Sequence, residues 1–178
     1  MRDTTIAFIG TGNMAGALIR GLLQDGHPAD RIIAADPDMD KLAAICGESG
    51  INSSSDNNAA VAGADVIVLA VKPQLMRDVC ESLAVAVQKS RPLIISVAAG
   101  THSRDIDDWL GAELPVVRVM PNQPALLLEG ASGMYANELT TNEQRDAWFS
   151  GYNDSVVTSV WVGFDSHEPL GRYEVDGK

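Results

Sequence analysis

Short apolar runs alternate with amphipathic stretches along roughly the first 120 residues. Runs rich in Ile, Val, Leu and Ala predict buried β-strands at 6–9, 31–36, 64–71, 92–97 and 115–120. Apolar residues at helical spacing predict helices between them, at 13–24, 38–46, 75–87 and 104–110. The polar stretch 47–57 is expected to contain one more short strand. This alternation predicts an α/β fold with a doubly wound, mostly parallel sheet.

The pattern changes after residue 137. Four of the nine aromatic residues lie between 148 and 161, namely Trp148, Phe149, Tyr152 and Trp161, and 156–162 is a β-branched run typical of a strand. Residues 165–178 are polar and rich in glycine, so we expect them to be frayed. We predict one domain over residues 1–138, followed by an irregular or β-like appendage at 139–178 that is not an independent domain.

Composition narrows the possible partners. The chain has 178 residues, of which 46% are hydrophobic, and this is enough for one well-packed domain. A net charge of −11 argues against binding to nucleic acid or to anionic membranes. No apolar run approaches the roughly 20 residues of a membrane span, and the N-terminus does not resemble a signal peptide. We therefore expect a cytoplasmic protein, with Cys46 and Cys80 as unpaired thiols.

A glycine-rich motif follows the first predicted strand and opens the first predicted helix. Its sequence, Gly10-Thr11-Gly12-Asn13-Met14-Ala15, is G-x-G-x-x-A. Gly10 permits a tight turn, Gly12 lets the backbone approach a pyrophosphate, and Ala15 lets the helix pack closely on the strand. The helix N-terminus adds free N–H groups and partial positive charge. The motif predicts a Rossmann-like domain that binds NAD or NADP.

Asp36 stands at the end of the second predicted strand, and two interpretations of it remain open. It could accept hydrogen bonds from the adenosine ribose hydroxyls, which would favour NAD over NADP. It could instead only begin the turn Asp36-Pro37-Asp38 and cap the second helix.

Other polar residues give weaker signals. Lys72 and Pro73 follow one central strand, and 98–100 follow the next, so these turns should meet at one sheet edge with room for a nicotinamide ring. Lys72 could instead be a solvated lysine held by its neighbours, which is the usual case for a lone lysine. The histidines at 27, 102 and 167 lie in turn-like or polar segments, where we expect solvated side chains. No nucleophilic set and no metal-ligand spacing is present, so we predict neither a catalytic residue nor a metal site.

Four segments in order, 8–15, 69–74, 96–100 and 118–125, resemble pyrroline-5-carboxylate reductase over about residues 4–137. The resemblance implies NAD(P)H-dependent reduction of the cyclic imine pyrroline-5-carboxylate to proline. Its implied cofactor-binding residues are Gly10, Thr11, Gly12, Asn13, Met14, Asp36, Asn57, Ala70, Val71, Lys72, Pro73, Ala98, Ala99 and Gly100. Its implied substrate-side residues are Asn122, Gln123 and Pro124, with Gln123 departing from the usual Thr.

The resemblance also raises an expectation about the chain beyond residue 137. Reductases of this family continue into a helical domain that forms the dimer interface and binds the substrate carboxylate, and no such segment is recognisable here. We therefore expect a monomer or weak association, weak dinucleotide binding and little turnover. Two alternatives remain open, namely another Rossmann-fold dehydrogenase or reductase and a non-catalytic dinucleotide-binding fragment.

The segments 140–153 and 160–165 resemble instead a fragment of the transpeptidase domain of class A penicillin-binding proteins. The fragment lacks the Ser-x-x-Lys nucleophile and the Lys-Thr-Gly motif, so no transpeptidase activity is expected. One interpretation is a truncated or chimeric chain that joins two unrelated pieces. The other is that 141–150 and 156–162 form the helix and strand that come next in the reductase fold.

Overall fold

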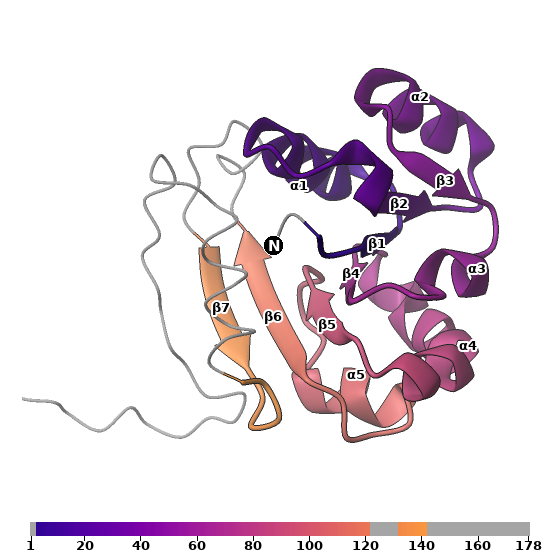
Figure 1. Cartoon of the computed structure of the whole chain (residues 1–178). Helices are drawn as coiled ribbons and strands as arrows, with labels where there is room; N and C mark the ends of the chain where they lie inside the picture. The colour runs from indigo at the N-terminus through magenta and orange to yellow at the C-terminus, as the bar shows by residue number, and fades with distance from the viewer. Residues whose placement is uncertain (1–2, 122–131, 142–178) are drawn as a thin grey trace, which may run out of the picture.

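A seven-stranded sheet runs through the part of the chain that the computed structural model describes, residues 3–121 and 132–141 (Figure 1). The strand order is β3-β2-β1-β4-β5-β6-β7, and every neighbouring pair is parallel except β6 and β7. The predicted doubly wound, mostly parallel α/β sheet is confirmed. The strands are β1 Ile6–Ile9, β2 Ile32–Ala35, β3 Asn52–Ser54, β4 Val66–Leu69, β5 Leu93–Ser96, β6 Val116–Pro121 and β7 Ser132–Ala136.

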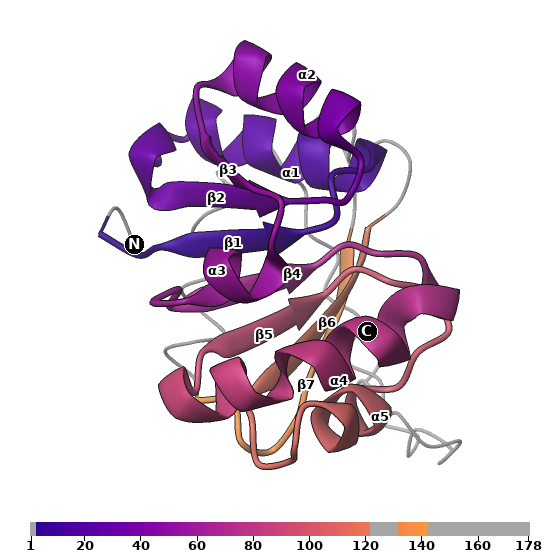
Figure 2. The same cartoon turned by 90° about the vertical axis from the view of Figure 1, so that its right-hand side faces the viewer.

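Helices cover both faces of the sheet (Figures 1 and 2). One face packs against α1 and α2, and the other packs against α3, α4 and α5. This arrangement buries β1 on both sides, with Ile6 and Phe8 in one core and Ala7 and Ile9 in the other. The helices are α1 Asn13–Gln24, α2 Met39–Ser49, α3 Asn57–Val61, α4 Pro73–Ser90 and α5 Ser103–Trp109, with a 3₁₀ turn at Ala29–Arg31.

The structure adds two elements that the sequence pattern did not predict. The strand β7 pairs antiparallel with β6 along its whole length, although the segment Ser132–Ala136 has no β-branched run. The short helix α3 begins in the stretch assigned to a polar loop, where Asp56 caps it by accepting a hydrogen bond from the Asn58 N–H. The predicted helix at 141–150 and strand at 156–162 fall almost wholly outside the described residues.

Asn137 attaches the end of β7 to the start of β6. Its Oδ1 accepts a hydrogen bond from the Val116 N–H at 3.0 Å, and its Nδ2 donates to the Leu114 carbonyl at 2.8 Å. The buried Thr140 donates its hydroxyl proton to the same Oδ1 at 2.9 Å. The chain is thus held to the sheet as far as Thr140, and the division of the chain at residue 138 stays a prediction.

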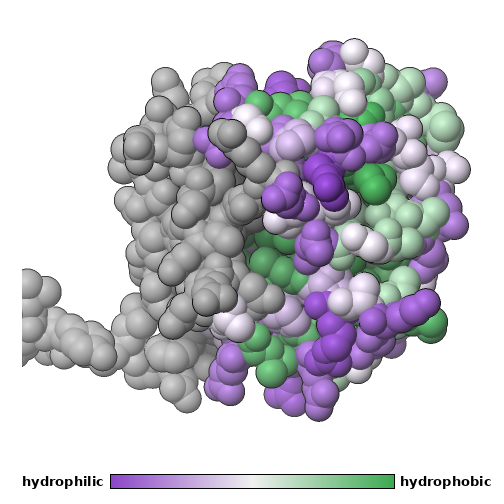
Figure 3. Space-filling model, in the orientation of Figure 1, coloured by the Kyte–Doolittle hydropathy of each residue, from purple (hydrophilic) through white to green (hydrophobic). Residues whose placement is uncertain are grey.

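The surface of the described part is mixed. Figure 3 shows polar residues over much of the face seen in Figure 1, with apolar residues in small groups between them. The large apolar side chains that are exposed lie on several elements: Met39, Leu75, Val85, Met120 and Leu139. Within residues 3–121 and 132–141, no helix is long and apolar enough to cross a membrane. In the same ranges no group of His, Cys, Asp and Glu could hold a metal ion.

The cysteines are unpaired, as predicted. Cys80 lies in the core beneath α4, where burial raises the pKa of its thiol to about 12. Cys46 is half-buried on α2. A thiol with so high a pKa stays protonated at neutral pH, and this makes Cys80 a structural residue.

The expectation of a solvated histidine is wrong for His27, which is only 7% exposed. The backbone N–H of His27 donates to the Leu22 carbonyl at 2.9 Å, and this bond fixes the turn after α1 against the end of the helix. Burial lowers the pKa of the imidazole, and a hydrogen bond with the Thr4 backbone partly opposes this shift. His102, in contrast, is exposed as predicted, and His167 lies outside the described residues.

The buried His27 makes stability depend on pH. Because its folded pKa lies below the ordinary value of about 6.5, the unfolded chain binds the proton more tightly. Its contribution is therefore complete above pH ~6.5 and is lost as the pH falls from that value through the lower folded pKa, with a slope of at most about 1.4 kcal/mol per pH unit. Urea unfolding from pH ~7.5 to ~5.5 should show this slope in the native chain and lose it in His27→Gln. His102→Gln is the matched control, and an equal slope in both variants would contradict the assignment.

Candidate functional site

A cavity of about 700 Å³ opens at the edge of the sheet where the parallel strands β1, β2 and β4 end. The strands β1 and β4 are neighbours although β2 and β3 separate them in sequence, so this is the point where the winding of the sheet reverses. Ligands of open α/β sheets bind at such points. The lining residues are Ile9, Gly10, Thr11, Gly12, Ala35, Asp36, Pro37, Asp38, Lys41, Ser55, Asp56, Asn57, Asn58, Ala70, Val71, Lys72, Leu75, Val79 and Ser82.

The protein itself requires glycine at position 10. Its φ of +96° lies in the region that side chains rarely adopt, and a Cβ there would come within 2.8 Å of the Ala70 carbonyl oxygen. The Gly10 N–H donates to the Ala35 carbonyl at 2.8 Å, and the Ala70 N–H donates to the Ile9 carbonyl at 2.8 Å. Gly10 therefore lets the ends of three strands come together at the base of the cavity.

The protein makes no such demand at Gly12. Its φ of −67° and ψ of 179° suit any residue, and no atom of the described residues lies within 4 Å of the position where a Cβ would be. Ala15, fully buried, packs the first turn of α1 against the core. The missing side chain of Gly12 thus leaves open space at the cavity wall, beside the start of α1.

The helix N-termini around the cavity differ in how they are capped. Side-chain oxygens of Asp38 and Asp56 cap α2 and α3, whereas Gly12 and Lys72 provide no side-chain cap for α1 and α4. The first N–H groups of α1 therefore have no side-chain acceptor among the described residues. At the start of α4, Pro73 has no N–H and the Leu75 N–H donates to the Lys72 carbonyl at 2.9 Å, so this helix offers fewer free donors. The positive ends of both helix dipoles border the cavity. Such a site suits an anion, and a diphosphate in particular.

Asp36 joins the glycine turn to the turn after β2. Its Oδ2 accepts hydrogen bonds from the Thr11 N–H at 2.8 Å and from the Thr11 hydroxyl at 3.0 Å. Its Oδ1 accepts one from the Asp38 N–H at 2.9 Å, which confirms its role in the turn. The helix cap, however, is Asp38 and not Asp36, so that part of the interpretation is wrong. The bracing of Thr11 was not predicted, because it joins residues 25 positions apart.

Lys41 and Asp38 form an ion pair at the rim, with 2.8 Å between Nζ and Oδ2. The hydrogen bond from Lys41 lowers the pKa of Asp38, and the same bond raises the pKa of Lys41. Lys72 is exposed on the opposite side of the cavity and makes no ion pair among the described residues. The predicted site did not include Lys41, which lies in the first turn of α2.

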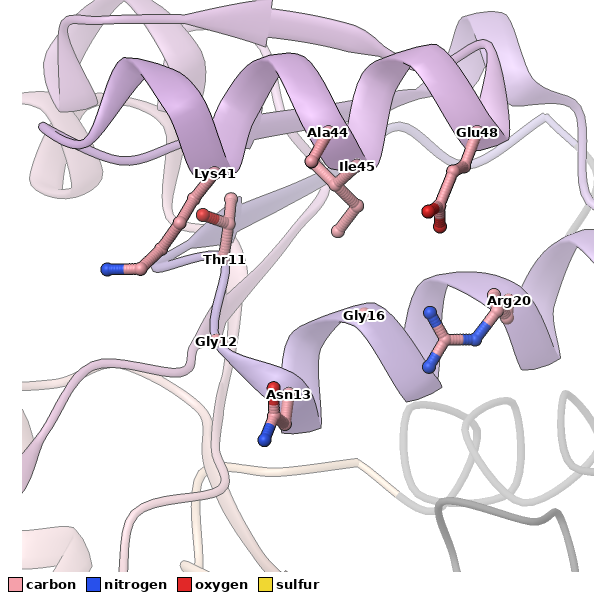
Figure 4. Close-up of a pocket in the computed structure, with 9 residues that line it drawn as sticks. All are labelled: Thr11, Gly12, Asn13, Gly16, Arg20, Lys41, Ala44, Ile45 and Glu48. Atoms are coloured by element: carbon pink, nitrogen blue, oxygen red, sulfur yellow. The ribbon is translucent and has the colours of Figure 1, made fainter.

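A second cavity of about 300 Å³ lies between α1 and α2 and shares Thr11, Gly12 and Lys41 with the first (Figure 4). Lys41 extends past Thr11, away from Arg20 and Glu48. The Arg20 guanidinium folds back over Gly16, where a Cβ would lie 3.4 Å from Nη1. The residues that line this smaller cavity are Thr11, Gly12, Asn13, Gly16, Arg20, Lys41, Ala44, Ile45 and Glu48.

The structure brings most of the predicted cofactor residues together. The larger cavity is lined by Gly10, Thr11, Gly12, Asp36, Asn57, Ala70, Val71 and Lys72, and the smaller one by Asn13. Met14 packs instead against the core beneath α1 and α2. Four further predicted residues follow β4 or β5 at the same sheet edge but line neither cavity: Pro73, Ala98, Ala99 and Gly100. Asn122, Gln123 and Pro124 lie outside the described residues.

Sequence reasoning missed the face of α4 that continues from the Lys72 turn. Leu75, Val79 and Ser82 line the larger cavity at helical spacing, opposite Asn57 and Asn58 of α3. Leu75 is 52% exposed, which is unusual for leucine in a globular domain. Leu75 is the third residue of α4 and follows a polar turn. An apolar residue at such a position was the sequence signal that could have identified this side of the larger cavity.

Comparison with known families agrees with this geometry. The sequence model of the family described as NADP oxidoreductase, coenzyme F420-dependent, matches residues 5–100, which are more than half of the chain. The chain belongs to this family. The matched region contains the glycine turn, Asp36 and the turns after β4 and β5.

Individual relatives are more specific. The chain is 53% identical over 137 residues to pyrroline-5-carboxylate reductase of Pseudomonas aeruginosa, covering 77% of this chain and 50% of that protein. It is 40% identical over 166 residues to the reductase of Vibrio alginolyticus, covering 93% and 60%. A solved pyrroline-5-carboxylate reductase from Coxiella burnetii superposes with a TM-score of 0.84 at 35% identity, covering 89% and 58%. The resemblance to this group of reductases is confirmed.

The chain spans between one half and three fifths of the length of these relatives. The alignment with the Vibrio protein covers 93% of the chain, so it continues past residue 137, where the motifs had placed the end of the resemblance. The alignment with the Pseudomonas protein covers only 137 residues, so both interpretations of the chain after residue 140 stay predictions. The likeness of 140–165 to a penicillin-binding protein lies almost entirely outside the described residues and stays a prediction.

Proposed function

We propose that the chain binds a nicotinamide dinucleotide, NAD(H) or NADP(H), and serves the reduction of pyrroline-5-carboxylate to proline. The observation that carries the proposal is Gly12. Among residues 3–121 and 132–141, no atom lies within 4 Å of the position that its Cβ would take, and that space adjoins the N-terminus of α1, which has no side-chain cap. A pyrophosphate placed there would receive the free N–H groups and the helix dipole at once.

The rest of the larger cavity fits the two ends of a dinucleotide. Asp36 and Asn57 stand at the end suited to the adenosine ribose, with the apolar side chains of Leu75 and Val79 beside it for the adenine ring. At the other end, Ala70 and Val71 close the turn after β4 with little side-chain bulk. The adjacent turn at 98–100, also of small residues, follows β5 at the same edge. These turns would face the nicotinamide.

The reaction depends more on the relative orientation of the nicotinamide and the imine than on acid–base side chains. A reduced nicotinamide supplies the hydride that the imine carbon accepts, and the imine nitrogen takes a proton. The chain binds the dinucleotide through backbone N–H groups of the protein. It holds one face of the nicotinamide ring against the turns of small residues after β4 and β5. We place no catalytic residue among the described ones. The substrate class rests on the names of the relatives, which are reductases of this imine.

The test is a titration of the chain with NADH and NADPH by calorimetry, after circular dichroism has shown that the sample is folded. We expect heat from at least one cofactor with one site per chain. Addition of pyrroline-5-carboxylate should then oxidise the bound cofactor, more slowly than the about 10 per second of a median enzyme. A folded chain that binds neither cofactor would overturn the proposal. Faster reaction with a 2-hydroxy acid and the oxidised cofactor would overturn the assigned substrate.

A further inference from the structure

The smaller cavity, between α1 and α2, has an end that the larger cavity does not share. Thr11, Gly12 and Lys41 line both cavities, whereas Gly16 and Arg20 of α1 line the smaller one alone. Arg20 lies about two helical turns along α1 from Gly12, where we place the pyrophosphate. The volume of about 300 Å³ is at the lower limit for ligand pockets, so this end suits a small molecule.

Opposite charges face the same space at this end (Figure 4). Arg20 projects into it from α1, and Glu48 projects into it from α2. Both side chains are exposed, and neither takes part in an ion pair within residues 3–121 and 132–141. Lys41 lies past Thr11 and is paired with Asp38. One positive and one negative charge are therefore available here, and a ligand that matches both must carry both charges itself.

Gly16 leaves the floor between these charges open, although the fold does not require a glycine there. It lies in the interior of α1 without a positive φ, and at such a position glycine is less stable than alanine. Among the described residues, a Cβ would make only ordinary contacts, 3.4 Å from Arg20 Nη1 and 3.8 Å from Ile45 Cδ1. Ile45 and Ala44 continue the floor with apolar side chains. The open space at Gly16 thus has no structural need behind it, and it makes room for an apolar group.

We propose that this end of the smaller cavity binds a small α-amino acid in its zwitterionic form. The Arg20 guanidinium donates hydrogen bonds to the carboxylate of the ligand, and the ammonium group of the ligand donates to the Glu48 carboxylate. The apolar part of the ligand lies on the floor at Gly16. The net charge of −11 does not oppose such a ligand, because a zwitterion has no net charge.

Proline is the first probe, because it is a zwitterion with an apolar ring and because the proposed function would form it. Only this choice of probe rests on the proposed function. Two analogues of similar ring size carry one charge each: pyrrolidine has the ammonium group, and cyclopentanecarboxylate has the carboxylate. A site for a bare anion would not distinguish cyclopentanecarboxylate from proline, whereas the proposed site does.

The experiment is a titration of the ¹⁵N-labelled chain with the three probes by NMR, in the native protein and in five variants. Arg20→Met keeps the apolar stem and removes the cation. Glu48→Gln keeps the size and removes the anion. Gly16→Ala adds one methyl group to the floor. Arg77→Met and Glu81→Gln are the matched controls, because these two residues form an exposed ion pair on α4 and line neither cavity.

We expect proline to bind the native chain with a dissociation constant on the order of 1 mM, as suits a small ligand at an open site. The largest amide shifts should lie at Gly16, Arg20 and 45–48. Arg20→Met and Glu48→Gln should each weaken binding about fivefold or more, as should the loss of either charge from the probe, and both controls should leave it unchanged. Gly16→Ala should weaken binding about threefold and raise the thermal midpoint, because alanine is the better helix former.

Four results would overturn the inference. The first is the absence of a saturable shift with proline up to about 20 mM. The second is a set of shifts centred on the larger cavity. The third is unchanged affinity in Arg20→Met and Glu48→Gln, which would leave these side chains as solvated charges. The fourth is equal binding of cyclopentanecarboxylate, which would mean an anion site at Arg20 alone. A chain that binds proline here but binds neither NADH nor NADPH supports this inference and overturns the proposed function.

Discussion

Replacing Gly10 by alanine is expected to lower the free energy of unfolding by about 3 kcal/mol or more and to abolish dinucleotide binding. Two penalties combine at this position. The φ of +96° is strained for any residue with a Cβ, and the added methyl would lie 2.8 Å from the Ala70 carbonyl oxygen. That carbonyl belongs to the backbone at the end of β4. It cannot move away without disturbing the adjacent bond from the Ala70 N–H to the Ile9 carbonyl.

Urea unfolding of Gly10→Ala and Gly50→Ala separates the two penalties. Gly50 also has a positive φ, +71°, but in the part of the chain that the structure describes no atom lies within 4 Å of the position that its Cβ would take. Gly50→Ala should therefore show only the backbone strain, about 1 kcal/mol. Equal losses in the two variants would mean that the contact with Ala70 contributes nothing.

Replacing Gly12 by valine is expected to leave the fold intact and weaken dinucleotide binding by about 100-fold or more. The backbone at Gly12 already has φ and ψ that valine adopts readily, and the side chain would enter open space. A loss of stability no greater than about 1 kcal/mol is expected from the poorer helix cap. The side chain would, however, occupy the place that we assign to the pyrophosphate.

Calorimetric titration with NADH, together with a thermal melt by circular dichroism, tests this prediction. The contrast with Gly10→Ala is informative, because the two glycines are two positions apart in one motif. Retention of full affinity in a folded Gly12→Val chain would show that the pyrophosphate does not lie at this turn. The proposed function would then lose the observation on which it depends.

The sequence alone predicted the fold class and the position of the glycine turn. Both depend on local information: apolar runs such as 6–9 for strands, helical spacing over 13–24, and a short motif between them. The core strands are buried on both faces, so their apolar character is continuous and easy to recognise. The context of the motif, between a strand and a helix, also indicated the sheet edge at which the larger cavity lies.

Other features required the tertiary structure, because they join residues that are distant in sequence. The strand β7 exists through its pairing with β6, and its own residues carry no strand signal. The pairing of Thr11 with Asp36 depends on β1 and β2 lying side by side. His27 was expected in solvent and is buried, because the turn after α1 packs against the body of the domain.

The sequence by itself thus determined that a strand, a glycine turn and a helix follow one another at the start of the chain, where we propose that the dinucleotide binds. The tertiary structure decided what surrounds it. Sheet order places the turn after β4 against Gly10, and the packing of α2 places Asp38 and Lys41 at the rim. Strand and helix patterns depend on residues that are close in sequence. The balance of charges at the cavity depends instead on turns that are distant in sequence and meet only in the folded sheet.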